Sequence, residues 1–254
     1  MAVLTEKQIK YGFDYYHKDE KQLKSVVEVS EYDGEDKLII NCTQLDEDYS
    51  AKDKKRILQE WCTFLVEHPD IFTELMFCTR MPQELFDAVC AQRRLKKLHI
   101  KWGVYPDISK LENLQELEYL HIGSGRSVSR LEPISRLVNL VALSIENFQQ
   151  IDDYAPLANL KHLESLALEG DFAAPKILKV QSLEFLRHMK QLCFFSFLTA
   201  KVIDKDYSPI LELNNLEHLT LKSCKEVKQL YPEFVKLPKL KYGTVLERPE
   251  LYEK

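Results

Sequence analysis

The sequence has few of the residues that build cofactor, metal or catalytic sites. Only 7 of its 254 residues are glycine, and neither Gly-x-Gly-x-x-Gly nor a P-loop occurs, so no phosphate-binding loop is indicated. Gly-x-Ser-x-Gly and His-Glu-x-x-His are also missing. The six cysteines are scattered without the Cys-x-x-Cys spacing of a zinc site, and we interpret them as buried free thiols in a reducing compartment. We therefore expect no enzyme activity, no cofactor and no metal.

Long basic and long apolar runs are missing as well. The net charge is −5 and the two signs are interspersed, so nucleic-acid binding is not expected. No segment reaches the apolar length of a membrane span, and the charged first ten residues lack the apolar region of a secretory signal. A cytoplasmic location without membrane contact is therefore expected. At 45% hydrophobic residues, the chain can bury a substantial core.

What the sequence does contain is a repeated phrase of one apolar residue, two variable residues, an apolar residue, one variable residue and a third apolar residue. Strong copies are Leu95-Lys-Lys-Leu98-His-Ile100, Leu117-Glu-Tyr-Leu120-His-Ile122, Leu140-Val-Ala-Leu143-Ser-Ile145, Leu163-Glu-Ser-Leu166-Ala-Leu168 and Leu216-Glu-His-Leu219-Thr-Leu221. Looser copies begin at Phe72 and Leu192, and a degraded eighth begins at Leu240. The middle positions (75, 98, 120, 143, 166, 195, 219, 243) lie 22 to 24 residues apart, with one spacing of 29. Units this small must stack and share a core.

Within a unit, two periodicities predict the local structure. Leu98-His99-Ile100 alternates as expected of a strand with one buried face, and strands of successive units must pair in parallel. Leucines three apart, as at Leu111, Leu114 and Leu117, favour a short 3₁₀ or irregular turn. About a dozen residues separate successive strands, which predicts a shallow horseshoe with a thin convex side.

These phrases, with segments such as Leu137-Val-Asn-Leu140, resemble the leucine-rich repeat family, in particular its short-repeat, internalin-like subtypes, over roughly residues 72 to 246. The resemblance implies an α/β solenoid whose parallel concave sheet recognises proteins, with no catalytic residues. One feature departs from the family, which usually has Asn or Cys three residues after the last strand leucine. The residues here are Gly103, Gly125, Phe148, Asp171, Ala200, Cys224 and Arg248, of which only Cys224 fits.

Residues 1–71 lack the repeat and are predicted to form an α+β N-terminal cap on the leucine-rich repeat domain of residues 72–254, which has about eight repeats and a C-terminal cap. Asp33-Gly34 between two apolar runs predicts a β-hairpin. A helix is predicted from an N-cap at Ser50, and another from Pro82 to Gln92. Alternatively, this region is a separate ligand-binding or enzymatic module. It carries an aromatic cluster: Tyr11, Phe13, Tyr15, Tyr16 and His17.

The side chains between the strand apolars should face the concave side and bind a partner. The predicted partner-binding residues are Lys97, His99, Lys101, Tyr119, His121, Glu146, Glu169, Phe194, His218, Lys222 and Tyr242. The predicted rim residues are Trp102, Tyr105, Phe148 and Phe172. Exposed aromatic side chains on a rigid sheet are typical of interface hot spots. His99 and His121 hold the same position in consecutive units, but Ser144 follows in the next, so a polar binding element is favoured over a metal site.

The long spacing places six extra residues within Gly170–Val180, which predicts either a functional loop or a short helix on the rim. The favoured function is a monomeric scaffold or adaptor that binds a protein on its concave face. The alternatives are a ligand-binding or enzymatic N-terminal module, with the repeats as scaffold, and an internalin-like surface adhesin. The sequence does not identify the partner.

Overall fold

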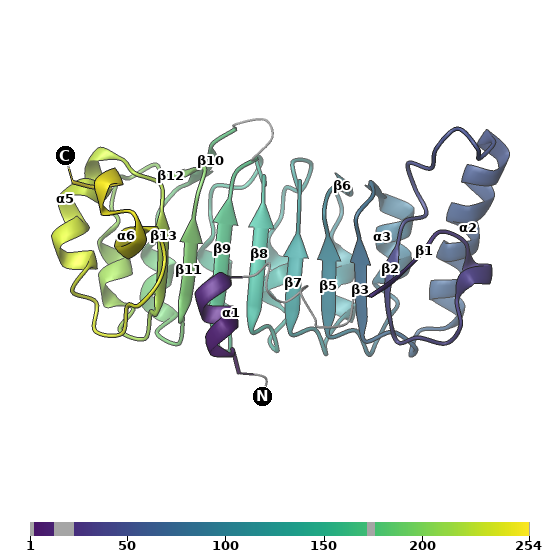
Figure 1. Cartoon of the computed structure of the whole chain (residues 1–254), viewed down its shortest axis with the longest axis horizontal. Coiled ribbons are helices and arrows are strands. Elements are labelled where there is room, and N and C mark those ends of the chain that lie inside the picture. The colour runs from purple at the N-terminus through teal and green to yellow at the C-terminus, as the bar shows by residue number, and fades with distance from the viewer. Residues whose placement is uncertain (1–2, 13–22, 172–175, 254) are drawn as a thin grey trace.

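The computed structural model describes residues 3–12, 23–171 and 176–253, and within them one parallel sheet runs the length of the molecule (Figure 1). Its nine strands are, in spatial order, β1 (Lys24–Val26), β2 (Lys37–Ile40), β3 (Glu74–Phe77), β5 (Lys97–Ile100), β7 (Tyr119–Ile122), β8 (Ala142–Glu146), β9 (Ser165–Glu169), β11 (Phe194–Phe197) and β13 (His218–Leu221). Every neighbouring pair is parallel. The predicted parallel solenoid is confirmed.

The repeat phrase sets the register of this sheet. The middle apolar residues of successive units lie side by side, as in Leu98↔Leu120, Leu120↔Leu143 and Leu143↔Leu166, and all four are fully buried. Because a slip of one residue would turn these leucines to the opposite face, the buried face fixes the register. The predicted register is therefore confirmed.

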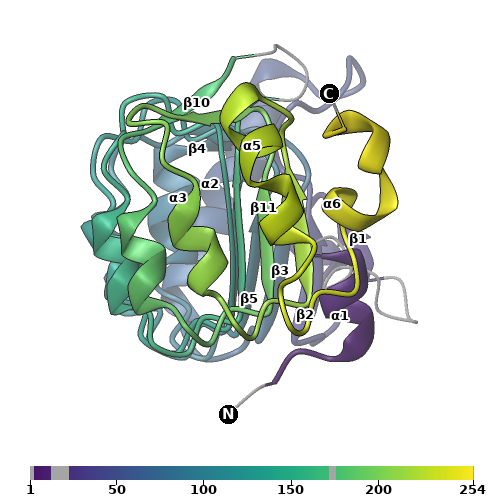
Figure 2. The same cartoon turned by 90° about the vertical axis from the view of Figure 1, so that its left-hand side faces the viewer.

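The convex side of the repeats consists of short turns: η3 (Ser109–Asn113), α4 (Glu132–Ser135), η4 (Ala155–Asn159), η5 (Glu184–His188) and η6 (Ser208–Glu212). Leucines three apart build them, as predicted. Leu114 N donates to Leu111 O at 2.9 Å, and Leu117 N donates to Leu114 O at 3.0 Å. Seen end-on, the sheet lies between this layer and two helices on its other face, α1 (Glu6–Tyr11) and α6 (Thr244–Glu247) (Figure 2).

The front of the chain differs from the prediction, because the β-hairpin is not formed. β1 and β2 pair in parallel and extend the main sheet, and the short turn η2 (Val29–Glu31) lies between them. The physical reason is burial: pairing with β3 places Val26, Leu38 and Ile40 in the shared core, whereas an isolated hairpin is at best marginally stable in water. The sheet and its core thus continue without a break across residues 71 and 72.

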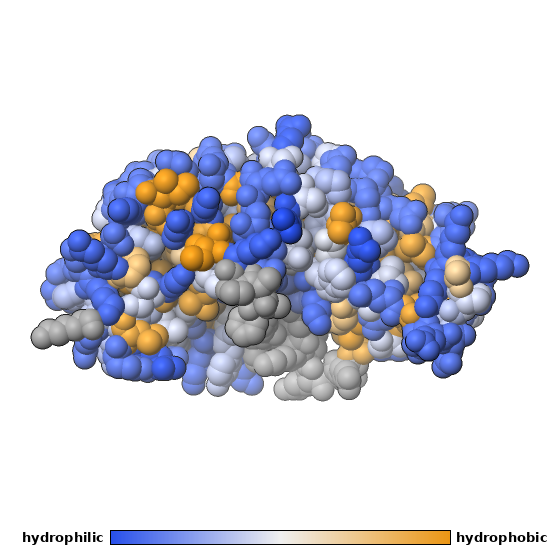
Figure 3. All heavy atoms as spheres, turned by 90° about the horizontal axis from the view of Figure 1, so that it is seen from above, coloured by the Kyte–Doolittle hydropathy of each residue, from blue (hydrophilic) through white to orange (hydrophobic). Residues whose placement is uncertain are grey.

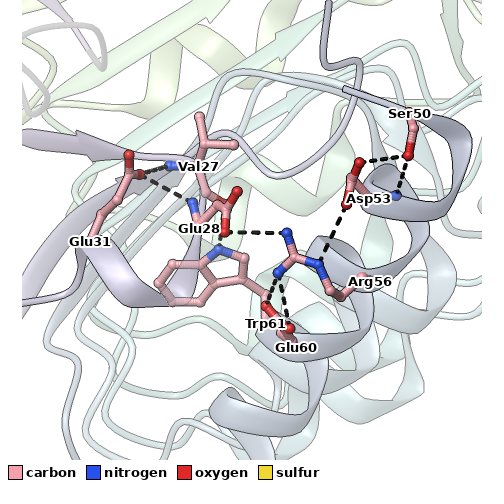
Figure 4. A network of polar contacts seen from close by, with 8 residues as sticks. All are labelled: Val27, Glu28, Glu31, Ser50, Asp53, Arg56, Glu60 and Trp61. Carbon is pink, nitrogen blue, oxygen red and sulfur yellow. Dashed lines mark hydrogen bonds and ion pairs between the residues drawn. The ribbon is translucent and has the colours of Figure 1, made fainter. Parts of the chain in front are cut away.

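The predicted helix after Ser50 is confirmed as α2 (Ala51–Glu67), and Ser50 Oγ accepts the N-cap hydrogen bond from Asp53 N at 3.1 Å. Polar contacts attach α2 to the loop after β1 (Figure 4). The indole nitrogen of the buried Trp61 donates to Val27 O at 2.7 Å, and Arg56 forms ion pairs with Glu28, Asp53 and Glu60. The second predicted helix is α3 (Gln83–Val89), with Pro82 at its N-cap.

At the C-terminal end, the degraded eighth phrase does not form a strand. It makes a single bridge, between His218 and Tyr242, and the chain then turns at Gly243 with φ +97° into α6. A Cβ atom on Gly243 would lie 2.3 Å from Leu219 O, so the turn requires glycine. The end of the solenoid is covered by α5 (Lys225–Phe234), α6 and η7 (Pro249–Leu251), with Tyr252 buried beneath them.

Two short parallel pairs lie beyond the upper ends of the main strands: β4 (Met81–Pro82) with β6 (Gly103–Val104), and β10 (Leu178–Val180) with β12 (Ala200–Val202). The described part of the 170–180 insertion therefore ends in a strand rather than in the rim helix considered above, and residues 172–175 lie outside the described residues. From above, the surface is mostly hydrophilic, and hydrophilic side chains interrupt its hydrophobic areas (Figure 3). No helix among the described residues is long and apolar enough to span a bilayer.

Candidate functional site

The outward side chains of the strands form three rows across the concave face. The lower row is Glu74, Lys97, Tyr119, Ala142, Ser165, Phe194, His218 and Tyr242; the middle row is Met76, His99, His121, Ser144, Ala167, Ser196 and Thr220. The upper row contains Lys101, Glu146, Glu169 and Lys222. The structure therefore brings the predicted partner-binding residues together on one face.

Charged groups occupy the N-terminal half of the lower row. The Glu74 side chain is 3% exposed, and its carboxylate lies 3.5 Å from Lys97 Nζ and 3.9 Å from Lys37 Nζ. Lys97 Nζ also lies 5.5 Å from the centre of the Tyr119 ring, within cation–π range. These contacts hold Lys97 against the sheet with its charge balanced.

The histidines of the middle row stack on each other. The ring centres of His99 and His121 are 4.3 Å apart with 13° between the planes, and His121 Nδ1 lies 3.0 Å from Ser144 Oγ. Within the described residues, no three His, Cys, Asp or Glu side chains are grouped to hold a metal ion. The pair thus forms a flat polar surface in the middle of the face.

The chain's own α1 covers part of the lower row of this face. It lies in front of β9 and β11 (Figure 1), and its contacts reach from Tyr119 on β7 to His218 on β13. Thr5 and Gln8 form a capping box at the start of α1. The apolar residues before and after this box, Leu4 and Ile9, stand at the two positions of a hydrophobic staple. Both are at least 92% buried, since they pack with the sheet residues Tyr119, Val141 and Ala142.

Polar contacts align α1 on the strands. Leu4 N donates to Glu164 Oε2 at 3.0 Å, and Tyr242 donates its hydroxyl hydrogen to Glu6 Oε1 at 3.0 Å. Lys10 Nζ lies 5.7 Å from the centre of the Tyr242 ring. Glu6 and Lys10 are one turn apart, so both reach the same tyrosine.

The helix ends against Phe194 and His218. Gly12 has φ +74°, and a Cβ there would lie 2.7 Å from Phe194 Cζ, so the chain approaches this ring as only glycine allows. The His218 imidazole lies 4.3 Å from the Phe194 ring centre, and its Nε2 is 2.8 Å from Thr220 Oγ1. Burial lowers the pKa of His218 to about 4, outweighing Glu247 and the backbone of residues 9 and 10, which raise it.

Several predicted site residues are not available to a partner. Tyr105 is buried, stacked on Phe86 at 5.1 Å and hydrogen-bonded to Gly123 O, so its assignment to an exposed rim is wrong. Phe148 is also buried, because its ring fills the space that Gly125 leaves without a side chain, and its rim assignment is wrong too.

The other predicted residues have varied environments. Tyr119, Phe194 and His218 lie on the predicted face but are buried, with α1 packed over them. Trp102 is half-buried, Lys101 and Lys222 are exposed, and Tyr11 is 59% exposed. The predicted residues outside the described part of the chain are Phe13, Tyr15, Tyr16, His17 and Phe172.

The sequence did not predict the contacts made by Leu4, Glu6, Ile9 and Lys10. A local signal was present, because Thr5-x-x-Gln8 flanked by Leu4 and Ile9 is the pattern of a capping box with a hydrophobic staple. That pattern predicts where a helix begins but not where the helix docks.

The six cysteines are all free; Cys42 and Cys90 are buried and the other four are half-buried. Burial raises the pKa of Cys42 to about 12 and the pKa of Cys62 and of Cys193 to about 11. Because the thiolate is the nucleophilic form, these three thiols are unreactive near neutral pH.

No family model and no curated protein matches the sequence. Among solved structures, a leucine-rich repeat protein of Leptospira interrogans is similar with a TM-score of 0.52 and 17% identity, over 82% of this chain and 50% of that one. An internalin of Listeria monocytogenes is similar with a TM-score of 0.44 and 17% identity, over 68% of this chain and 53% of that one. Internalin C2 of the same species has a TM-score of 0.42 and 17% identity, over 72% of this chain and 83% of that one.

The chain thus spans about half the length of the first two structures. At this identity the likeness concerns the fold, and it agrees with the parallel ladder, the 22- to 24-residue period and the 3₁₀ turns of the convex side. The chain has the leucine-rich repeat fold.

Proposed function

We propose that this protein is a binding scaffold that recognises a protein partner on its concave face. The observation that carries the proposal is the docked α1. The concave face buries two apolar side chains of a helix, accepts one of its backbone N–H groups through Glu164 and donates a hydroxyl to its carboxylate through Tyr242. A surface that makes these contacts with one protein segment has the chemistry needed to hold another.

The footprint of the partner includes the part of the face beside α1. It contains the stacked pair His99 and His121, and an upper row that runs from Lys101 through the neighbouring Glu146 and Glu169 to Lys222. Basic groups at both ends and acidic groups in the centre favour a partner with the reverse order of charges.

We propose no enzymatic function for the N-terminal region, because its best candidate pocket has little chemistry. A groove of about 360 Å³ between α2 and α3 is lined by residues that include Cys62, Asp87 and Lys110. Lys110 Nζ is already paired with Asp87 at 2.7 Å, and burial raises the pKa of Cys62 to about 11. Because the raised pKa keeps the Cys62 thiol protonated near neutral pH, the groove provides no activated nucleophile.

The test is comparative affinity purification from native lysate, with quantitative mass spectrometry. Three forms of the chain serve as bait: the wild type, the concave-face variant Lys101→Glu with His99→Ala, and the control Lys161→Glu. Lys161 is exposed in a turn that follows η4, off the sheet.

We expect one protein to be enriched by the wild type and by Lys161→Glu, and reduced at least fivefold with the concave-face variant. A loss of fivefold corresponds to about 1 kcal/mol, the usual threshold for an interface residue that contributes to affinity. Equal recovery with all three baits would contradict the concave-face assignment, and so would loss with the control alone.

A further inference from the structure

The contacts of α1 with the sheet are separate from the core of the solenoid. The main core lies on the other face of the sheet and extends from Val26 to Tyr252. Leu4 and Ile9 take no part in it; they form a cluster of their own with three sheet residues, to which Cys193 and Tyr242 add partly buried surface. The solenoid core is therefore complete without α1.

One side of α1 packs on the sheet. Leu4 and Ile9 are buried there, whereas Val3 is 70% exposed and the side chains of Thr5, Lys7 and Tyr11 are also exposed. The contacts described above need only a short list of features: a capping box between two apolar residues, an acidic side chain in the first turn and a basic one a turn later. Any amphipathic helix with these features would fit the same strands.

The surface beneath α1 has the composition of a protein interface. Tyr119, Phe194 and His218 stand in one row on rigid strands, and Tyr242 continues the row through its bridge to His218. Aromatic side chains of this kind dominate binding energy at interfaces. Without a helix in place, Tyr119, Val141 and Phe194 would lose a cover that now keeps them at least 92% buried.

We propose that the lower row of the concave face, from β7 to β13, is a binding site for an amphipathic helix of the protein partner, and that α1 occupies this site until such a helix displaces it. This inference rests on the proposed function and specifies the partner's chemistry. Since α1 is tethered to the sheet, its effective concentration is high, so the partner helix must bind more tightly than α1 does.

The experiment uses a fluorescein-labelled synthetic peptide with the sequence of residues 3–12 and the full-length protein in three forms. These are the wild type, the double variant Leu4→Asp with Ile9→Asp, and the single variant Ile9→Ala, which adds no charge. Fluorescence anisotropy measures peptide binding, and circular dichroism measures the fold of each form.

We expect both variants to stay folded, because their own α1 is outside the solenoid core. We also expect the peptide to bind the double variant at least tenfold more tightly than the wild type, with Ile9→Ala between them. Two matched controls should abolish this increase in peptide affinity. The first is a peptide carrying Leu4→Asp and Ile9→Asp, and the second is the double variant with Tyr119→Ala added in the sheet.

Three results would overturn the inference. They are unfolding of both α1 variants, equal peptide affinity for all three forms, and no peptide binding to the folded double variant. This test can fail while the proposed function holds. If the peptide does not bind, but the variant Lys101→Glu with His99→Ala still loses a partner, the concave face binds a protein and α1 is a permanent part of the fold. If the peptide binds but no partner depends on Lys101 and His99, the partner's footprint is limited to the lower row.

Discussion

Replacing Ile9 by alanine should weaken the docking of α1 and leave the solenoid core folded. Ile9 is 8% exposed and packs in the small cluster on the concave face, outside the main core. The substitution removes three carbons, and at about 0.8 kcal/mol per buried methylene group it weakens docking by about 2 kcal/mol, or roughly thirty-fold. Release of α1 is a local opening that leaves the rest of the protein folded, so the free energy of global unfolding can fall by at most this docking loss.

Leu143 provides the matched comparison. It is fully buried between Leu120 and Leu166 in the main core, and its replacement by alanine should lower the free energy of global unfolding by about 2 to 5 kcal/mol. Hydrogen exchange followed by mass spectrometry reports local opening, and urea unfolding reports global stability.

We expect the amides of residues 9 and 12, which bond to Thr5 O and Gln8 O, to exchange roughly thirty-fold faster in Ile9→Ala, by the docking loss above. The urea midpoint should fall by no more than the docking loss of about 2 kcal/mol divided by the urea m-value. In Leu143→Ala the midpoint should fall. If Ile9→Ala lowered the urea midpoint by more than the docking loss allows, α1 would be part of the solenoid core, and this prediction would be wrong.

Three further predictions concern pH, backbone conformation and a buried hydroxyl. The pKa of His218 is about 4 beneath α1 and ordinarily about 6.5, so docking is fully favourable above about pH 6.5 and weakens as the pH falls towards 4. The affinity of the residue 3–12 peptide for the double variant should therefore drop between pH 7 and pH 5. This drop in affinity should vanish when His218→Asn is added to the double variant. Gly243→Ala should destabilise the fold by at least about 1 kcal/mol more than Gly34→Ala in thermal unfolding. Both glycines have positive φ, but of the two only Gly243 has backbone atoms where a Cβ would lie. Equal losses of stability in the two variants would show that the turn at Gly243 relaxes to make room. Tyr105→Phe should lower the free energy of unfolding by urea by about 1 to 2 kcal/mol, because Gly123 O loses its buried hydrogen-bond donor. Partner binding should be unchanged. A loss of partner binding would show that Tyr105 belongs to the interface.

The repeats could be predicted from the sequence because their contacts are periodic. Leu98 and Leu120 occupy equivalent positions in successive units, so the spacing alone places them side by side. The parallel pairing of β1 and β2 was not predicted, because β1 has Lys24 where the repeat has leucine and because Asp33-Gly34 resembles a hairpin turn.

The burial of Tyr105 and Phe148 was not predictable, because it depends on space left by glycines. Phe148 fills the gap at Gly125, which lies in the preceding unit. The docking of α1 had no sequence signal either: Leu4 N meets Glu164 and Glu6 meets Tyr242, contacts that span 160 and 236 residues. Local patterns predict helices, whereas contacts at this separation arise only from the assembled surface.

We propose that the concave face is the surface that holds a protein partner, and photocrosslinking in native lysate identifies the surface that the partner touches. A benzoylphenylalanine residue is placed at His99 on the concave face or at Arg136, which follows α4 on the convex side. We predict that one protein is crosslinked from position 99 and not from position 136. Crosslinking of that protein from position 136 alone, or equally from both positions, would contradict the claim.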